Sequence, residues 1–136
     1  MIKYIDMEDK KNENLEEASD EEVKKDPKIT YDDFKKIEIK VGEIIAAEKI
    51  EEADRLLKLK VKFAEDERQI VSGISEYYED PQELIGKKVP FVTNLEPRKI
   101  MGYESDGMIM AAIDRENSNF SLLEINSIIP SGTDIS

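Results

Sequence analysis

Three lysines on one predicted strand are the first residues in this sequence whose spacing suggests chemistry. Lys58, Lys60 and Lys62 alternate with the apolar residues of the segment 57–63. Alternate residues of a strand share one face and lie about 7 Å apart, so their ammonium groups are spaced to follow a phosphate backbone. On this pattern alone, an ordinary solvated strand face is the simpler interpretation.

The segment Asn94–Met110 (NLEPRKIMGYESDGMIM) is a second candidate. It combines two cations with aromatic, methionine, amide and hydroxyl side chains, and it is longer than a minimal connection between strands. Aromatic and methionine side chains can contact nucleobases, amides and hydroxyls can bond to base edges, and cations bind phosphates. The alternative is a structural loop in which Ile100 and Met101 pack beneath the neighbouring strands.

Catalytic and metal-binding chemistry has little support in this chain. It contains no Cys and no His, which removes disulfides, thiolate zinc sites, a Cys nucleophile and the commonest general base. The acidic clusters at 32–33, 65–67 and 79–80 are typical of solvated turns, and Ser72 lacks the frame of a hydrolase nucleophile. We therefore expect no catalytic residue, no metal site and no cofactor.

The charge balance argues against a general nucleic-acid binder. The 136 residues include 32 acidic and 20 basic ones, for a net charge of −12, whereas such binders are strongly basic. Residues 1–28 carry 10 acidic and 6 basic residues and few apolar ones, which predicts a disordered or partly helical acidic tail. The predicted domain, residues 29–136, keeps 22 acidic and 14 basic residues and so remains at net −8.

The hydropathy pattern does not suggest a membrane protein. No apolar run approaches the roughly 20 residues that cross a bilayer, and the N-terminus lacks a basic region followed by an apolar stretch. The chain is therefore expected to be soluble and cytoplasmic, with no membrane partner.

Strands must position the candidate residues. Thr30–Asp33 resembles a capping box that opens a short helix ending near Lys36, and Gly42 interrupts the first strand pattern, which predicts a bulge or bend. Two short helical turns separated at Asp80-Pro81 follow the third strand.

The strand patterns cover 37–47, 57–63, 69–73, 89–93, 108–113 and 120–125, with a hairpin turn at 117–119. This order predicts an all-β, OB-type barrel of five to six strands with short helices, because that fold places a helix between its third and fourth strands.

Seven short motifs occur in order between residues 29 and 135. They are Asp33-Phe34-x-Lys36, Lys40-Val41-Gly42-Glu43-Ile44, Ala53-Asp54-Arg55-Leu56-Leu57-x-Leu59, Arg68-Gln69-Ile70-Val71-Ser72-Gly73-Ile74, Glu83-Leu84-Ile85-Gly86-Lys87, Asn94-Leu95-x-Pro97-Arg98-Lys99-Ile100-Met101-Gly102 and Ser105-x-Gly107-Met108-x-Met110-Ala111-Ala112. Together they resemble the OB-fold tRNA-binding domain family. That family includes the C-terminal domain or β subunit of methionyl-tRNA synthetases, free-standing tRNA-binding proteins, cytokine-precursor domains and a chaperone-like relative.

The resemblance implies an OB barrel, usually dimeric, that binds tRNA largely by shape. Related domains use the basic residue of an Ala-Asp-Lys-Leu motif, the Asn of Asn-Leu, and the Ser and Met of Ser-x-Gly-Met. The expected tRNA-binding residues of this chain, including neighbouring cations and the strand lysines, are Arg55, Asn94, Arg98, Lys99, Ser105, Met108, Lys58 and Lys60.

The chain departs from the family pattern at three points. Lys40 stands where the family often has Arg, Glu51-Glu52 replaces a His-Pro, and the overall balance is more acidic. Arg55 in place of the motif's Lys keeps the charge and adds planar hydrogen-bond donors. The extra carboxylates near residue 53 are expected to reduce affinity for RNA.

The functional expectation is a non-catalytic tRNA-binding module. It would be the C-terminal domain or β subunit of a methionyl-tRNA synthetase, with tRNA as ligand and either a second copy of itself or the catalytic subunit as protein partner. The alternative is a chaperone-like or protein-interaction dimer on the same fold. The continuous apolar run Met108–Ile113 allows this alternative, because a strand that is apolar on both faces must bury the second one.

Overall fold

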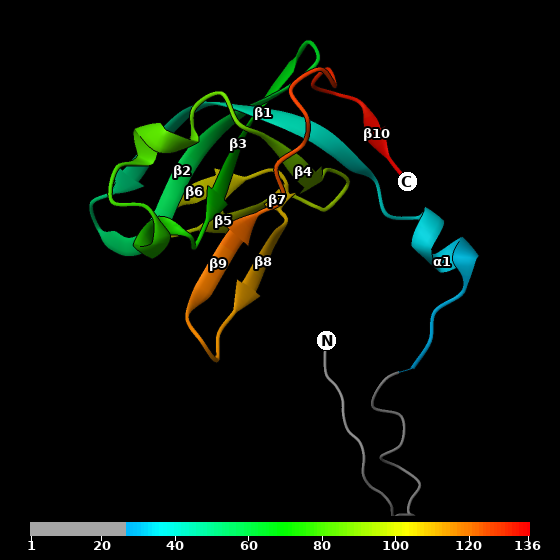
Figure 1. The fold of residues 1–136 in the computed structure, drawn as a ribbon, viewed down its shortest axis with the longest axis horizontal. Helices are drawn as coiled ribbons and strands as arrows, with labels where there is room; N and C mark the ends of the chain where they lie inside the picture. Colours follow the sequence, from blue (N-terminus) through cyan, green and yellow to red (C-terminus); the bar gives the residue numbers. More distant parts are fainter. Residues whose placement is uncertain (1–26) are drawn as a thin grey trace, which may run out of the picture. The chain divides into compact units, whose positions relative to one another are not determined.

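The computed structural model describes residues 27–136 (Figure 1). The predicted acidic tail, residues 1–28, therefore lies almost wholly outside the described residues, and the boundary at residue 29 stays a prediction. Residues 35–136 form one compact unit, while most of the helix α1 (Tyr31–Lys35) belongs to another unit that ends at Phe34 and is considered by itself. None of the helices within residues 27–136 is long and apolar enough to cross a membrane.

The helix α1 begins at the predicted capping box. The amide of Asp33 donates to Thr30 Oγ1 at 3.0 Å, and the amide of Thr30 donates to Asp33 Oδ2 at 3.4 Å. This exchange satisfies amide groups that a helix leaves without partners in its first turn. Asp therefore fills the position that Glu or Gln usually occupies, and the helix ends at Lys35, one residue before the predicted end.

Antiparallel strands form the frame of the unit at residues 35–136 (Figure 1). The main sheet has the order β3-β2-β1-β4-β7, and β10 pairs with β1. Its strands are β1 (Ile39–Ile50), β2 (Ala53–Phe63), β3 (Asp66–Ser72), β4 (Lys88–Val92), β7 (Met108–Ile109) and β10 (Asp134–Ile135). Two separate pairs are β5 (Arg98–Ile100) with β6 (Tyr103–Ser105), and β8 (Ala111–Asp114) with β9 (Asn119–Leu122).

The alternation along β2 decides which side chains form the core. The inward residues are almost completely buried: Leu57, Leu59, Val61 and Phe63. Successive side chains of a strand point to opposite faces, so the lysine row at 58, 60 and 62 lies on the outer face, as predicted. β3 pairs with β2 without interruption. The register of β2 therefore also determines which side chains of β3 point into the core.

The bulge in β1 lies three residues beyond the predicted position. The register with β2 shifts after Ile44, so Ile45 is the extra residue, and the assignment of a bulge to Gly42 was wrong. Glycine is required at position 42 for a different reason. A Cβ built there would lie 2.6 Å from both Phe91 Cδ1 and Val61 Cγ1, so a core ring occupies the space that any side chain would need.

Two short helical turns cover one end of the core, between the third and fourth strands as predicted. They are η2 (Ser75–Tyr77) and η3 (Pro81–Leu84). Leu84 is fully buried, and the amide of Gly86 donates to the carbonyl of Ile44 at 2.8 Å. The turns therefore seal the barrel at the point where β1 bulges.

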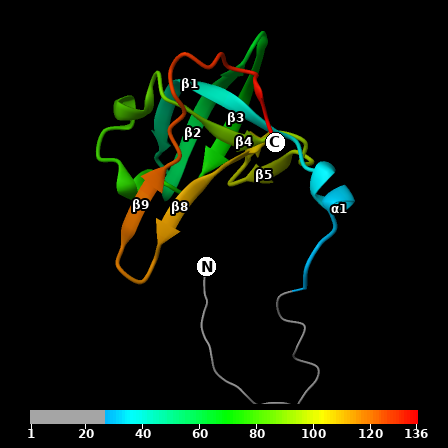
Figure 2. The same cartoon turned by 45° about the vertical axis from the view of Figure 1, so that its right-hand side comes forward.

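The β8–β9 hairpin is anchored through Phe120. Its ring stacks on Tyr77 with centroids 4.2 Å apart, and Tyr78 meets it edge-on at 5.8 Å. Burial raises the pKa of the Tyr78 hydroxyl, and the carboxylates of Glu124 and Glu83 raise this pKa further. Beyond this anchor the hairpin projects away from the main sheet in both ribbon views (Figures 1 and 2).

The segment Asn94–Met110 is more ordered than the predicted loop. It contains the β5–β6 hairpin, whose turn places Met101 at φ 52° and Gly102 at φ 85°. The next predicted strand, 108–113, is divided at Met110 into β7 and β8, and the Met110 amide donates to the carbonyl of Pro90 at 3.1 Å. The strand pattern missed the break at Met110 because the residues on both sides of it are apolar.

The sheet curls so that the outer edge of β3 meets the chain around β6. The amide of Asp106 donates to the carbonyl of Gln69, and the amide of Val71 donates to Ser105 Oγ, both at 2.9 Å. These bonds join the edge of the sheet to a later segment and close part of the barrel. The all-β, OB-like prediction is therefore confirmed.

Replacing Gly42 with Ala tests the close packing of β1 against the core. The added methyl group would overlap the Phe91 ring and Val61, and we expect the free energy of unfolding to fall by about 1–3 kcal/mol, typical of overpacking. Urea denaturation followed by circular dichroism measures this change. Gly73→Ala is the control, because a Cβ there meets only a backbone oxygen at 4.0 Å. Equal stability of the two variants would contradict the packing role.

Candidate functional site

A cleft of about 490 Å³ lies beside the β5–β6 hairpin. We call it the apolar cleft, and its lining residues are Val71, Leu95, Glu96, Arg98, Ile100, Ser105, Gly107 and Met108. Three of the eight predicted binding residues line it, namely Arg98, Ser105 and Met108. Aliphatic and thioether side chains make up much of the wall, with one cation and one carboxylate among them.

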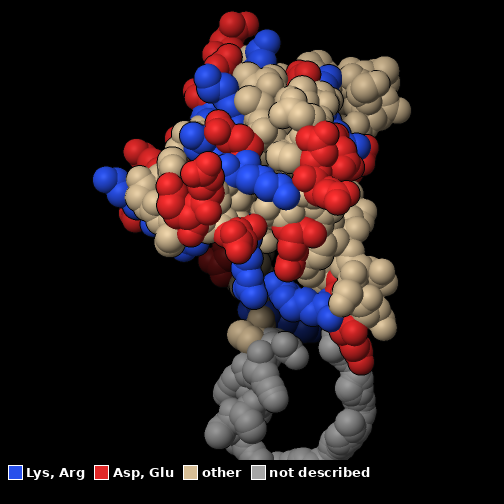
Figure 3. Space-filling view, turned by 90° about the vertical axis from the view of Figure 1, so that its left-hand side faces the viewer, with Lys and Arg blue, Asp and Glu red and all other residues tan. Residues whose placement is uncertain are grey.

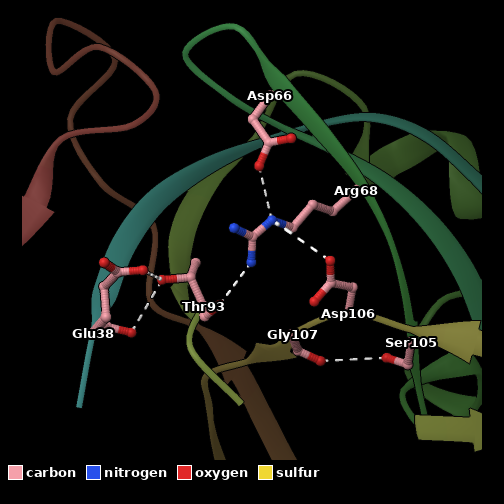
Figure 4. Close-up of polar contacts among 7 residues, drawn as sticks. All are labelled: Glu38, Asp66, Arg68, Thr93, Ser105, Asp106 and Gly107. Carbon is pink, nitrogen blue, oxygen red and sulfur yellow. Dashed lines mark hydrogen bonds and ion pairs between the residues drawn. The ribbon is translucent and has the colours of Figure 1, made fainter. Parts of the chain in front are cut away.

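Ser105 lies at the floor of the apolar cleft and is only 4% exposed. Its hydroxyl accepts the hydrogen bond from the Val71 amide at 2.9 Å and lies 3.3 Å from the carbonyl oxygen of Gly107, to which it can donate. Figure 4 shows the Ser105–Gly107 contact. The side chain is therefore engaged within the fold, and its geometry is that of a residue that positions the cleft.

Gly107 sets the direction of the chain into β7. Its φ is +141°, and a Cβ there would lie 2.9 Å from Ile70 Cδ1 and 3.2 Å from the carbonyl oxygen of Val92. A side chain would thus be strained and crowded at this position. The glycine allows Met108 to begin β7 with its side chain 49% exposed at the cleft.

A second hollow, of about 320 Å³, crosses the outer face of β1, β2 and β3. We call it the basic groove, and its lining residues are Ala46, Glu48, Lys58, Leu59, Lys60 and Gln69. Lys58 Nζ lies 5.2 Å from the centre of the Tyr103 ring, a distance at which a cation and an aromatic face attract. Tyr103 pairs across the hairpin with Ile100 of the apolar cleft, so the two hollows are neighbours.

Both lysines of the basic groove face carboxylates of the same chain. Lys58 Nζ lies 3.6 Å from Glu48 Oε2, and Lys60 Nζ lies 3.8 Å from Glu67 Oε1. Such partly exposed pairs contribute roughly 0–1 kcal/mol each. A phosphate would therefore have to replace these carboxylates or share the lysines with them, at a small energetic cost.

Two predicted cations line neither hollow. Arg55 is exposed near the start of β2, where the pairing with β1 is irregular, because Ala53 pairs with Ile50 and Leu57 pairs with Lys49. Lys99 alternates with Arg98 along β5 and therefore lies on the side of the hairpin away from the apolar cleft. The predicted residues are thus only partly gathered on one surface.

Asn94 ties the start of the hairpin segment to the chain before β1. Its side-chain amide donates to the carbonyl of Lys36 at 2.6 Å, and its Oδ1 accepts from the amide of Glu38 at 2.9 Å. Both ends of the side chain are thus occupied by backbone groups. The next residue, Leu95, lines the apolar cleft, so this tie helps to position the cleft wall.

Sequence reasoning missed the polar network around Arg68 (Figure 4). Its guanidinium donates to the carbonyl of Thr93 at 2.7 Å, and its Nε lies 2.9 Å from Asp66 and 3.8 Å from Asp106. The Thr93 hydroxyl in turn donates to Glu38 Oε1 at 2.6 Å. The sequence did contain a sign of this network. Arg68 alternates with the buried Ile70 along β3, and an inward-facing guanidinium needs a hydrogen-bond partner for each of its donors.

Charges of both signs are mixed across the face drawn in Figure 3. Lysine and arginine side chains lie beside aspartate and glutamate side chains there, and no large patch of one sign is formed. Within residues 27–136, no group of three or more acidic side chains is placed to hold a metal ion. Any binding of a polyanion to this face must therefore depend on individual cations rather than on a broad positive field.

The family model described as "Putative tRNA binding domain" matches residues 39–134, which span nearly all of the unit that contains both hollows. The chain belongs to this tRNA-binding domain family. The domain of this family is non-catalytic, and the confirmed OB-like fold agrees with membership.

Several curated proteins similar to this chain are methionine–tRNA ligases. The ligase of Caldanaerobacter subterraneus subsp. tengcongensis is 47% identical over 137 residues, covering 97% of this chain and 21% of the ligase. The ligase of Methanospirillum hungatei is 46% identical over 128 residues, covering 93% of this chain and 18% of the ligase. The chain thus spans about a fifth of the length of these relatives.

Two solved structures with a similar fold carry different descriptions. A methionyl-tRNA-synthetase-related protein from Pyrococcus horikoshii superposes with a TM-score of 0.74 at 39% identity, covering 79% of this chain and 97% of that one. The chaperone CsaA from Bacillus anthracis superposes with a TM-score of 0.70 at 26% identity, covering 80% and 99%. The fold of the tRNA-binding domain family is therefore shared with a protein described as a chaperone.

Replacing Ser105 with Ala tests whether its hydroxyl holds the cleft together. The Val71 amide would lose its acceptor in a buried position, and we expect a loss of about 1–3 kcal/mol in the free energy of unfolding. Thermal and urea unfolding measure it, with Ser127→Ala as the control, because Ser127 is exposed on the C-terminal segment. If both variants unfold like the unmodified chain, the hydroxyl has no positioning role.

Proposed function

We propose that this chain is a non-catalytic tRNA-binding module, either the C-terminal domain or the β subunit of a methionyl-tRNA synthetase. It binds tRNA by shape and increases the capture of tRNA by the synthetase. The observation that carries the proposal is a family match to residues 39–134 that includes the basic groove and the apolar cleft. The similarity to methionine–tRNA ligases supports the synthetase as the associated enzyme.

The geometry supports contact with the phosphate backbone rather than with base sequence. Lys58 and Lys60 share the outer face of β2, and Arg98 lies at the neighbouring apolar cleft. The hydrogen-bonding side chains of Asn94 and Ser105 are already bonded within the fold. The cations would therefore bind phosphates, while Asn94 and Ser105 position the surface, and recognition would follow the shape of the RNA.

Arg55 and Lys99 extend this surface in the proposal. Neither residue lines the basic groove or the apolar cleft. Lys99 lies on the opposite face of β5 from Arg98, so one flat footprint would not reach both of these cations. A folded tRNA presents phosphates in several directions and can follow a convex edge. Met108 contributes apolar contact at the cleft in the same proposal.

The acidic charge makes linkage an important part of the function. With 32 acidic against 20 basic residues, a single copy would repel RNA at a distance and bind it weakly. Two linked binding surfaces raise the effective concentration of the second contact. We therefore propose that the chain works as a homodimer or in association with the synthetase catalytic subunit, in the cytoplasm, where it would meet tRNA.

A second candidate is a chaperone-like or protein-interaction role. The similarity to CsaA, which is described as a chaperone, favours it. The exposed side chains of Leu95 and Met108 at the apolar cleft would then contact an unfolded chain. This candidate needs apolar surface but not the cations, and that difference separates the two functions experimentally.

Reversing the charge of Arg98 tests the tRNA function. In Arg98→Glu, one phosphate contact is replaced by repulsion, and we expect binding of mixed tRNA to weaken about tenfold and the slope of log K against log salt to fall by about 1. Electrophoretic mobility shifts at several salt concentrations measure both quantities. Arg115→Glu is the matched control, since it makes the same charge change on the β8–β9 hairpin.

The two candidate functions predict different results for these variants. Under the tRNA function, Arg98→Glu loses affinity and Arg115→Glu keeps most of it. Under the chaperone-like function, both variants retain an unfolded peptide equally well, and tRNA binding is absent even at low salt. Binding of tRNA that does not depend on salt would also contradict the proposed phosphate contacts.

A further inference from the structure

We propose that the apolar cleft binds one unpaired nucleotide of the RNA, with its base between Leu95 and Met108 and its phosphate beside Arg98. This inference rests on the proposed function and goes beyond recognition by shape. It assigns a part of the surface that would read single-stranded RNA rather than the backbone of a folded helix.

The size and walls of the cleft suit a nucleobase. Its volume of about 490 Å³ falls in the range of small-molecule sites. Leu95 and Met108 are 46% and 49% exposed, so they present apolar surface to water at its mouth. A planar base inserted between them would bury that surface, and the faces of every base are suitable for such contact.

The lining of the apolar cleft has few polar side chains, and two of them are charged, Arg98 and Glu96. A guanidinium can bind a phosphate, and a carboxylate can accept a hydrogen bond from an exocyclic amino group of a base. Ser105 offers little more, because its hydroxyl is bonded to Val71 and Gly107. The cleft would therefore accept several bases, with a preference for the larger apolar faces of purines.

The neighbouring basic groove favours a nucleotide over a peptide side chain. Lys58 lies beside the Tyr103 ring, and Tyr103 pairs with Ile100 in the wall of the apolar cleft. An RNA strand that places one base in the cleft would thus lead its next phosphates toward Lys58 and Lys60. An apolar peptide would gain nothing from these cations.

The cleft is already formed in the protein without RNA. Gly107 holds its backbone in a conformation that other residues rarely adopt, and Ser105 joins β6 to β3. Binding would therefore require little ordering of the protein, which preserves affinity for a ligand as small as one nucleotide.

Two RNA hairpins with the same stem test the proposal. One is blunt, and the other carries a single unpaired 2-aminopurine nucleotide at its 3′ end. Fluorescence anisotropy at low salt with the full 136-residue chain measures both affinities. We expect the hairpin with the unpaired purine to bind about tenfold more tightly, a typical contribution of one contacted base, and its 2-aminopurine fluorescence to change on binding.

Matched variants locate the effect. Leu95→Ala and Met108→Ala should each reduce the preference for the unpaired purine to less than about threefold. Leu95→Ala should leave the affinity for the blunt hairpin almost unchanged. Leu123→Ala, at an exposed leucine with 42% exposure, and Met101→Ala, at a methionine with 60% exposure, lie outside the cleft lining and should keep the full preference. Thermal unfolding shows whether each variant is folded. If a variant does not fold, the 2-aminopurine fluorescence measured with the unmodified chain still tests the proposal.

Each other outcome overturns the assignment in a distinct way. Equal affinity of the unmodified chain for both hairpins, with no change in 2-aminopurine fluorescence, removes the nucleotide site but leaves the proposed function intact. Absence of binding to either hairpin and to tRNA removes the proposed function as well. An apolar peptide that binds the unmodified chain but not Met108→Ala, with the hairpins bound equally, assigns the cleft to a polypeptide instead.

Discussion

The hydrogen bonds between β3 and the chain around β6 are the constraint on which the candidate site depends. Ser105 accepts from the Val71 amide, and the Asp106 amide donates to the carbonyl of Gln69, so residues more than thirty positions apart are joined at a buried edge. These bonds hold the β5–β6 hairpin against the sheet and set the distance between the walls of the apolar cleft. The shape of the site is therefore determined by a buried hydroxyl and backbone groups, and the cations are attached to a surface that is already formed.

Electrostatics limits what this surface can do. The lysines of the basic groove lie within 4 Å of Glu48 and Glu67, and the chain as a whole carries a net charge of −12. Partly exposed ion pairs are weak, so RNA phosphates can compete with these carboxylates, but each contact then gives less than it would on a basic protein. Low affinity for a single copy, strong sensitivity to salt and a need for linkage follow from the same balance of charges.

Local patterns were enough to predict the frame but not the site. The alternation of β2, the capping box at Thr30 and the helical turns near Pro81 are short-range signals, and the structure confirms all three. The β5–β6 hairpin was missed because its strands have only three residues each, which is too short for an alternating pattern to be recognised. The family resemblance predicts Ser105 as a tRNA-binding residue, but the sequence did not indicate that its hydroxyl is buried and hydrogen-bonded within the fold.

The central claim, that tRNA is bound by the surface formed from β2 and the β5–β6 hairpin, is tested most directly by nuclear magnetic resonance. Unlabelled tRNA is titrated into the ¹⁵N-labelled chain, and the amide signals that shift or broaden are mapped onto the structure. The predicted result is a continuous set of changes around Lys58, Lys60, Arg98 and Met108, with the β8–β9 turn unaffected. Changes confined to β8–β9 and the C-terminal segment, with the signals of β2 and β5 unaltered, would contradict the claim.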